Sequence, residues 1–125
     1  MATERETVLI TGMPCLQARG LLHLILEVEP ETDLVAVVLS KRLELVASIV
    51  DALPAEHRRR VTLLEGDAAA IDLGLSGSEY RDLAARVTRI HHTAHVSWVG
   101  VDRETAEYAN IQGAVEMVEL GRAAE

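Results

Sequence analysis

The sequence predicts an α/β protein with a Rossmann-like parallel sheet of about four strands, in the order 3-2-1-4, and helices on both faces. Short apolar runs of the kind found in strands that are buried on both faces alternate with segments in which apolar residues recur at helical spacing. Turn residues or polar residues follow each strand-like run. Four such alternations indicate parallel strands joined by right-handed crossovers.

The elements can be placed in chain order. Strands are expected at residues 7–11, 34–39, 61–64 and 87–92. Helices are expected at residues 16–28, around the apolar positions Leu43, Val46 and Val50 up to Pro54, at 79–86 behind a Ser78 cap, and from about residue 102 onward with an interruption at Gly113.

Composition limits the kinds of partner. The 125 residues, 49% of them apolar and 26% charged, predict a single domain spanning residues 1–125. A net charge of -8 and an aromatic content of 2% argue against nucleic acid as a partner. Because no apolar run reaches the roughly 20 residues of a membrane span and the first residues are charged, no membrane association and a cytoplasmic location are expected.

Four motifs fall at the predicted strand ends, where folds of this type bind their ligands. They read TGMPCLQA (11–18), LLEGDAAAIDLGLS (63–76), IHHTAHVSW (90–98) and NIQGAVEMVELG (110–121). In this order the chain resembles the extended short-chain dehydrogenase/reductase family. It is most similar to the reductase domains of carboxylic acid reductases, fatty acyl-CoA reductases and thioester reductases, over nearly its whole length.

The resemblance implies a dinucleotide site. It assigns the pyrophosphate to the turn from Thr11 and Gly12 through Cys15 and Leu16 to Ala18. It assigns the adenine to Asp67 and Ala68, and the ribose-side border near the nicotinamide to Thr93 and Ala94. It also matches Asn110 to a helix asparagine that supports the active site.

The catalytic Tyr-x-x-x-Lys pair of that family is absent from the sequence. Four residues after Tyr80 and Tyr108 stand Ala84 and Gln112, and Lys41 is the only lysine. Because the reaction needs a tyrosine whose pKa is lowered by a nearby lysine, we do not expect hydride transfer by this chain alone.

The first turn keeps only part of the glycine pattern. Gly12 can form the tight turn and Ala18 is a tolerated third residue. Cys15, however, places a side chain where bare backbone should meet pyrophosphate, and Pro14 has no N–H to offer. These substitutions favour a structural turn, so dinucleotide binding is expected to be weak or lost.

The residues after the second strand suggest which dinucleotide is bound. Ser40, Lys41 and Arg42 stand where an acid would bind the 2′-hydroxyl of NAD. Two cations in the first turn of a helix oppose its dipole, so an anion such as the 2′-phosphate of NADP would stabilise them. A solvated charged surface is the alternative.

Three other clusters have simpler interpretations. Cys15 could be a reactive thiol at a helix N-terminus, but a small packing residue is favoured. His91, His92 and His95 could be considered as metal ligands. Side chains of a strand alternate between its two faces, so His91 and His92 are expected to point in opposite directions, which argues against a site formed by the three histidines. The arginines at 58–60 are interpreted as solvated residues near the C-terminal end of the second helix.

Two functions remain open. The leading hypothesis is the nucleotide-binding half of a reductase-like protein. The alternative is a non-catalytic assembly or regulatory module that keeps the fold. Since the fourth strand would have an open edge, a homo-oligomer through that edge is expected. The chain could also be the N-terminal piece of a longer gene product.

Overall fold

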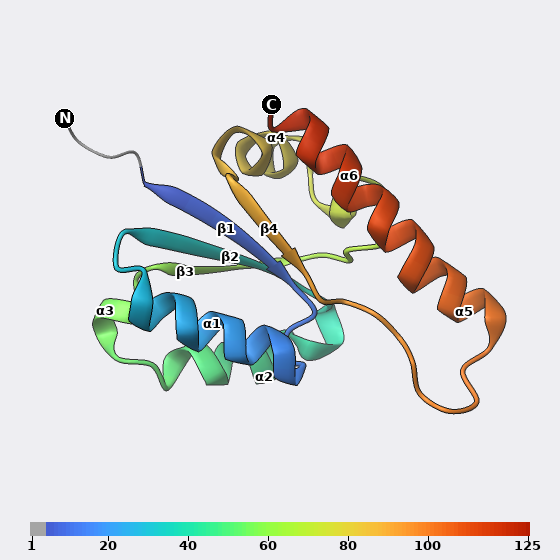
Figure 1. Ribbon diagram of the computed structural model, residues 1–125, viewed down its shortest axis with the longest axis horizontal. Coiled ribbons are helices and arrows are strands. Elements are labelled where there is room, and N and C mark those ends of the chain that lie inside the picture. Colours follow the sequence, from blue (N-terminus) through green and yellow to red (C-terminus); the bar gives the residue numbers. More distant parts are fainter. Residues whose placement is uncertain (1–4) are drawn as a thin grey trace.

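The computed structural model, which describes residues 5–125, contains one parallel sheet with helices on both faces (Figure 1). The strand order is β3-β2-β1-β4, as predicted. The strands are β1 (Glu6–Thr11), β2 (Thr32–Val38), β3 (Val61–Glu65) and β4 (Arg89–His92). All three strand pairs are parallel. The predicted fold class is therefore confirmed.

Two helices cover one face of the sheet, and two cover the other (Figure 1). The first pair is α1 (Leu16–Val28) and α2 (Ser40–Asp51); the second is α4 (Gly77–Arg86) and α6 (Gly113–Ala123). Shorter segments are α3 (Ala55–Arg58), the 3-10 turn η1 (Ile71–Gly74), α5 (Arg103–Glu107) and the π-helical turn η2 (Tyr108–Gln112). Within residues 5–125, no helix combines the length and the apolar character needed to cross a membrane.

Alternation along β1 divides the core into two layers. Val8 and Ile10 pack with residues of α1 and α2, whereas Leu9 packs with residues of α4 and α6. Successive side chains of a strand point to opposite faces, so the apolar run Val8–Leu9–Ile10 in the middle of β1 fills both layers. All three side chains are buried. This central strand directs the turn at residue 12 to the carboxyl edge of the sheet.

Several predicted boundaries are wrong. Ser76, not Ser78, caps α4, and its side chain and that of Glu79 form a reciprocal capping box. Val87 ends α4 by donating its N–H to the carbonyl of Leu83, so β4 begins at Arg89. The short helix α3, which follows Pro54, was not predicted.

The final helix was predicted as one long element interrupted at Gly113. The structure instead has a π-helical turn immediately before Gly113, and α6 begins at that glycine. A Cβ at Gly113 would lie 3.4 Å from the His92 ring. An added methyl group would thus only touch the ring, so α6 packs against the end of β4 at ordinary contact distance.

The three neighbouring arginines after α2 have different roles. Arg58 is exposed near the C-terminal end of α2, as predicted, and donates to the carbonyl of Asp51. The expectation is wrong for Arg60, whose guanidinium donates instead to the carbonyls of Leu26, Glu29 and Thr32. It thus binds carbonyls at the C-terminal end of α1 and links them to the start of β2.

Replacing Arg60 with alanine should lower the free energy of unfolding by about 2–3 kcal/mol, because the carbonyls lose a charged donor inside a partly buried contact. Chemical denaturation would measure the change. Arg59→Ala is the matched control, since Arg59 is exposed and forms no side-chain hydrogen bond with the described residues. Equal stability of the two variants would contradict the capping role of Arg60.

Candidate functional site

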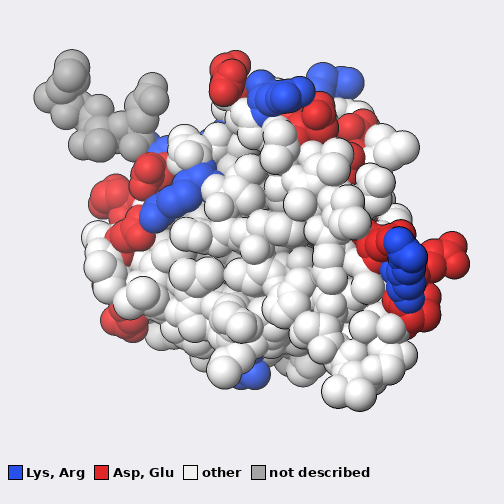
Figure 2. Space-filling view, turned by 45° about the vertical axis from the view of Figure 1, so that its right-hand side comes forward, with Lys and Arg blue, Asp and Glu red and all other residues white. Residues whose placement is uncertain are grey.

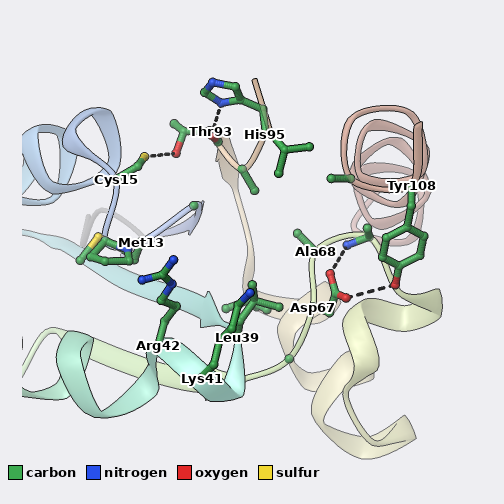
Figure 3. Close-up of a pocket in the computed structure, with 18 of the residues that line it drawn as sticks. Met13, Cys15, Leu39, Lys41, Arg42, Asp67, Ala68, Thr93, His95 and Tyr108 are labelled. Atoms are coloured by element: carbon green, nitrogen blue, oxygen red, sulfur yellow. Dashed lines mark hydrogen bonds between the residues drawn. The ribbon is translucent and has the colours of Figure 1, made fainter. Parts of the chain in front are cut away.

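A cleft of about 610 Å³ lies at the carboxyl edge of the sheet. Its walls come from the turn after β1, the start of α2, the loops after β3 and β4, and the α5–η2 segment (Figure 3). Eight of the residues assigned from the sequence line it together: Gly12, Cys15, Lys41, Arg42, Asp67, Ala68, Thr93 and Ala94. The fold thus gathers residues from four strand ends in one place.

Five assigned residues do not line the cleft, and two of them are Ala18, which is fully buried in α1, and Asn110 of η2. Thr11 is fully buried beneath it, Leu16 is 84% exposed, and Ser40 contributes no wall. Conversely, the sequence did not identify Trp98, Thr105 and Tyr108 as cleft residues. Of these residues, only Trp98 had a signal in the sequence, because it is an isolated aromatic residue shortly after a strand end.

The turn after β1 is fixed by close contact with the chain after β4. Gly12 has a φ of +95°, which favours glycine. A Cβ at this position would collide with Thr93 Oγ1 and lie 2.8 Å from the nitrogen of Ala94. Gly12 therefore allows the β1 turn and the β4 end to meet at the floor of the cleft.

The Cys15 side chain caps α1. Its sulfur accepts from the N–H of Ala18 at 3.5 Å and lies 3.3 Å from Thr93 Oγ1 (Figure 3), and its own N–H donates to the Gly12 carbonyl at 2.8 Å. In the described structure, the first-turn amides of Leu16 and Gln17 have no protein acceptor. These two amides are what the turn can still offer to an anion.

Thr11 connects the ends of β1 and β4. Its hydroxyl oxygen accepts from the N–H groups of Thr93 (3.1 Å) and Ala94 (3.2 Å). Because both lone pairs are then used, the hydroxyl donates to Nδ1 of His92 at 2.7 Å. The Thr93 hydroxyl in turn donates its one proton to the Thr11 carbonyl at 2.6 Å. In the contact between Thr93 and Cys15 the thiol is therefore the donor and the Thr93 oxygen is the acceptor. Thr11 thus positions the residues that border the cleft.

His92 is a neutral histidine in this network. Burial, and then the neighbouring His95, lower the pKa of His92. Because Nδ1 accepts from Thr11, the ring proton is on Nε2 and no free lone pair remains for a metal. Across residues 5–125, no three side chains of the His, Cys, Asp or Glu type converge as possible metal ligands.

The start of α2 is rich in positive charge. Lys41 and Arg42 lie in its first turn and line the cleft, as predicted. Leu39 occupies the N-cap position without a side-chain hydrogen bond, and the first turn contains no acidic residue. Within residues 5–125, neither cation forms an ion pair. Figure 3 shows the Arg42 guanidinium directed towards Met13.

Two side-chain contacts hold the far wall. Asp67 Oδ1 accepts from the N–H of Ala69 at 2.9 Å, and Oδ2 accepts from the Tyr108 hydroxyl at 3.1 Å (Figure 3). Asn110 forms two bonds with Val96, accepting from its N–H and donating to its carbonyl, each at 2.9 Å. The α5–η2 segment is thereby tied to the loops after β3 and β4.

Comparison with known structures supports the fold. The chain is similar to the terminal R domain of the myxalamid PKS-NRPS pathway (21% identity, TM-score 0.84, 100% of this chain and 33% of that chain). It is also similar to the reductase (R) domain of a nonribosomal peptide synthetase from Mycobacterium tuberculosis (25% identity, TM-score 0.69, 94% of this chain and 30% of that chain). A third similar structure is the PhqB reductase domain from Penicillium fellutanum (20% identity, TM-score 0.71, 98% of this chain and 35% of that chain).

The chain spans about a third of the length of these solved chains. No curated protein matches it in sequence. Residues 10–125 match the model of an NAD-binding family described as "Male sterility protein". This match and the R-domain structures confirm the resemblance to extended short-chain dehydrogenases/reductases. The chain therefore belongs to the NAD-binding male sterility protein family.

Proposed function

We propose that the cleft binds NADP(H) in preference to NAD(H), with low affinity, and that this chain does not transfer hydride by itself. Lys41 and Arg42 carry the proposal. They line the cleft at a helix N-terminus that has no side-chain cap, and no carboxylate of the described residues pairs with them. A phosphate monoester supplies the negative charge that these cations and the helix dipole favour.

The rest of the cleft suits the other parts of a dinucleotide. Leu16 and Gln17 do not line the cleft but follow its residue Cys15 directly, and their amides, which have no acceptor among the described residues, are available to a pyrophosphate oxygen. Asp67 and Ala68 would contact the adenine, while Thr93 would border the nicotinamide end. Membership of an NAD-binding family and likeness to reductase domains both support a dinucleotide as the ligand. When bound, the nicotinamide would supply the hydride chemistry of such reductases.

The same residues explain why affinity should be low. The Cys15 sulfur occupies the N–H of Ala18, and the Cys15 amide is used by Gly12. Pro14 contributes no N–H. The turn therefore keeps fewer free amides than three glycines would leave. Since the sequence contains no Tyr-x-x-x-Lys pair, the proton donor of the family reaction is also missing from these 125 residues.

Thermal unfolding with added nucleotide tests the proposal. At 100 times its dissociation constant, a ligand should stabilise the protein by about 2.7 kcal/mol. NADPH is expected to raise the unfolding midpoint at lower concentration than NADH does. Equal responses to the two would refute the 2′-phosphate preference, and no response to either at millimolar concentration would refute nucleotide binding.

Replacing Cys15 with glycine should strengthen NADPH binding about three- to tenfold, because it removes the sulfur from the turn and frees the Ala18 N–H. Loss of the cap should cost the unliganded protein up to about 1 kcal/mol. Isothermal titration and chemical denaturation measure the two effects. Cys15→Ser is the control, since its hydroxyl can still cap α1; unchanged affinity in the glycine variant would show that the side chain does not limit binding.

A second candidate function is a module for assembly or regulation that self-associates. Within the described sheet, β4 pairs only with β1, so its other edge is open. The adjacent helical segments expose Ile111, Val115 and Val118 at helical spacing. Figure 2, which brings the side with α5 and α6 forward, shows a wide uncharged area with charged side chains at its rim.

Sedimentation velocity separates this candidate from a monomeric binding domain. A dimer that dissociates when Val115 and Val118 are replaced with aspartate would support assembly through this face. A monomer at several hundred micromolar would refute it.

A further inference from the structure

Tyr108 closes the end of the cleft that the proposed function assigns to the adenine. It lies at the junction of α5 and the π-helical turn η2, and its side chain reaches the loop after β3 (Figure 3). Its hydroxyl donates to Asp67 Oδ2 at 3.1 Å, and its ring lines the cleft together with Ala68 and Ala109. Tyr108 is 46% exposed, so it contributes a wall rather than core packing.

The phenol is suited to a permanent donor role. Burial in the cleft wall, and then the bond to Asp67, raise the pKa of Tyr108. The hydroxyl therefore keeps its proton at neutral pH. The carboxylate beside it can only accept hydrogen bonds, and each of its oxygens has more than one acceptor position. One donor to each oxygen, from Ala69 and Tyr108, leaves acceptor positions open.

The two donors fix the orientation of the carboxylate. The Ala69 N–H fixes Oδ1 from the protein backbone, whereas the Tyr108 hydroxyl fixes Oδ2 from a different element, 41 residues further along the chain. A second bond between the same two regions runs from the N–H of Asp72 to Glu116 Oε1 at 3.2 Å. The loop after β3 is thus braced against the α5–α6 segment at two points.

We propose that Tyr108 is a positioning residue for base recognition: by holding the Asp67 carboxylate, it makes the cleft select a purine that carries a 6-amino group. The inference rests on the proposed function, since it concerns the base of the same dinucleotide. An acceptor that is already oriented gains more from an amino donor than one that must be ordered on binding. The contribution of Tyr108 is therefore specific to ligands that carry the amino group.

The test compares two ligands that differ only at this group. Isothermal titration of the full 125-residue chain gives dissociation constants for NADP⁺ and for nicotinamide purine dinucleotide phosphate, in which hydrogen replaces the 6-amino group. The wild type should bind NADP⁺ at least about tenfold more tightly than the purine analogue. In Tyr108→Phe this ratio should fall about three- to tenfold, while the affinity for the analogue changes less than twofold.

Two further variants complete the design. Asp67→Ala should reduce the ratio to about one, because it removes the acceptor. Tyr80→Phe is the matched control: it removes the only other tyrosine hydroxyl, on α4, outside the cleft, and should leave the ratio unchanged. Unfolding midpoints without ligand confirm that each variant is folded.

The outcomes separate this inference from the proposed function. If Tyr108→Phe keeps the wild-type ratio, or if it weakens both ligands equally, the positioning role is overturned while NADP binding stands. If the wild type binds neither dinucleotide, the proposed function fails and the inference fails with it.

Discussion

Replacing Gly12 with alanine is expected to destabilise the protein by more than about 3 kcal/mol, a large share of the 5–15 kcal/mol typical of a single domain. The backbone at Gly12, with φ +95°, is unfavourable for alanine. The added methyl group would also overlap Thr93 Oγ1 and approach the Ala94 nitrogen. Relief of that overlap requires the turn after β1 to separate from the end of β4, where Thr11 bonds both residues.

A second glycine provides the control for this prediction. Gly20 lies in the middle of α1, and a Cβ built there has no atom within 4 Å. Gly20→Ala should therefore stabilise the protein by about 0.5–1 kcal/mol, because glycine is unfavourable inside a helix. Chemical denaturation of both variants gives the comparison. A small loss in Gly12→Ala would mean that the β4 end can move away at little cost.

Replacing Lys41 and Arg42 together with glutamine is expected to weaken NADPH binding about 10- to 100-fold and to leave NADH binding nearly unchanged. The two side chains offer charged donors to the 2′-phosphate, and NADH has a neutral hydroxyl in its place. Because both residues are exposed, the effect should shrink as ionic strength rises. Titration calorimetry at two salt concentrations measures the affinities and their salt dependence.

Arg59→Gln is the control for this second prediction, since Arg59 lies shortly before the first residue of β3, at the amino end of that strand, whereas the cleft is at the carboxyl edge of the sheet. Its NADPH affinity should match that of the wild type. Single Lys41→Gln and Arg42→Gln variants would apportion the loss between the two residues. A double variant that still prefers NADPH over NADH would show that the 2′-phosphate binds elsewhere.

Much of the fold could be predicted because its elements have local signals. The run of apolar residues 34–38 in β2 and the helical spacing in α1 each determine an element type without information from distant residues. The cap of α4 also had a local signal that was misinterpreted. Ser76 and Glu79 have the spacing of a capping box, whereas Ser78 has no such partner three residues later.

The cleft was predicted in outline because parallel strands bring their carboxyl ends to one edge. This rule placed Gly12, Asp67 and Thr93 together from the sequence alone. It could not predict contacts made by helices far along the chain. The bond between Tyr108 and Asp67 depends on the orientation of α5 and η2, which the packing of α6 on the sheet determines. The contacts of Arg60 with α1 depend on tertiary structure in the same way.

The paired bonds between Asn110 and Val96 make the shape of the cleft depend on the chemistry of one amide group. Asn110 accepts through its oxygen and donates through its nitrogen. Hydrolysis of that amide to an acid would replace the donor with a second oxygen, which would repel the Val96 carbonyl. Spontaneous deamidation of this one side chain would thus detach the loop that follows β4 and alter the mouth of the cleft, although the gene would be unchanged.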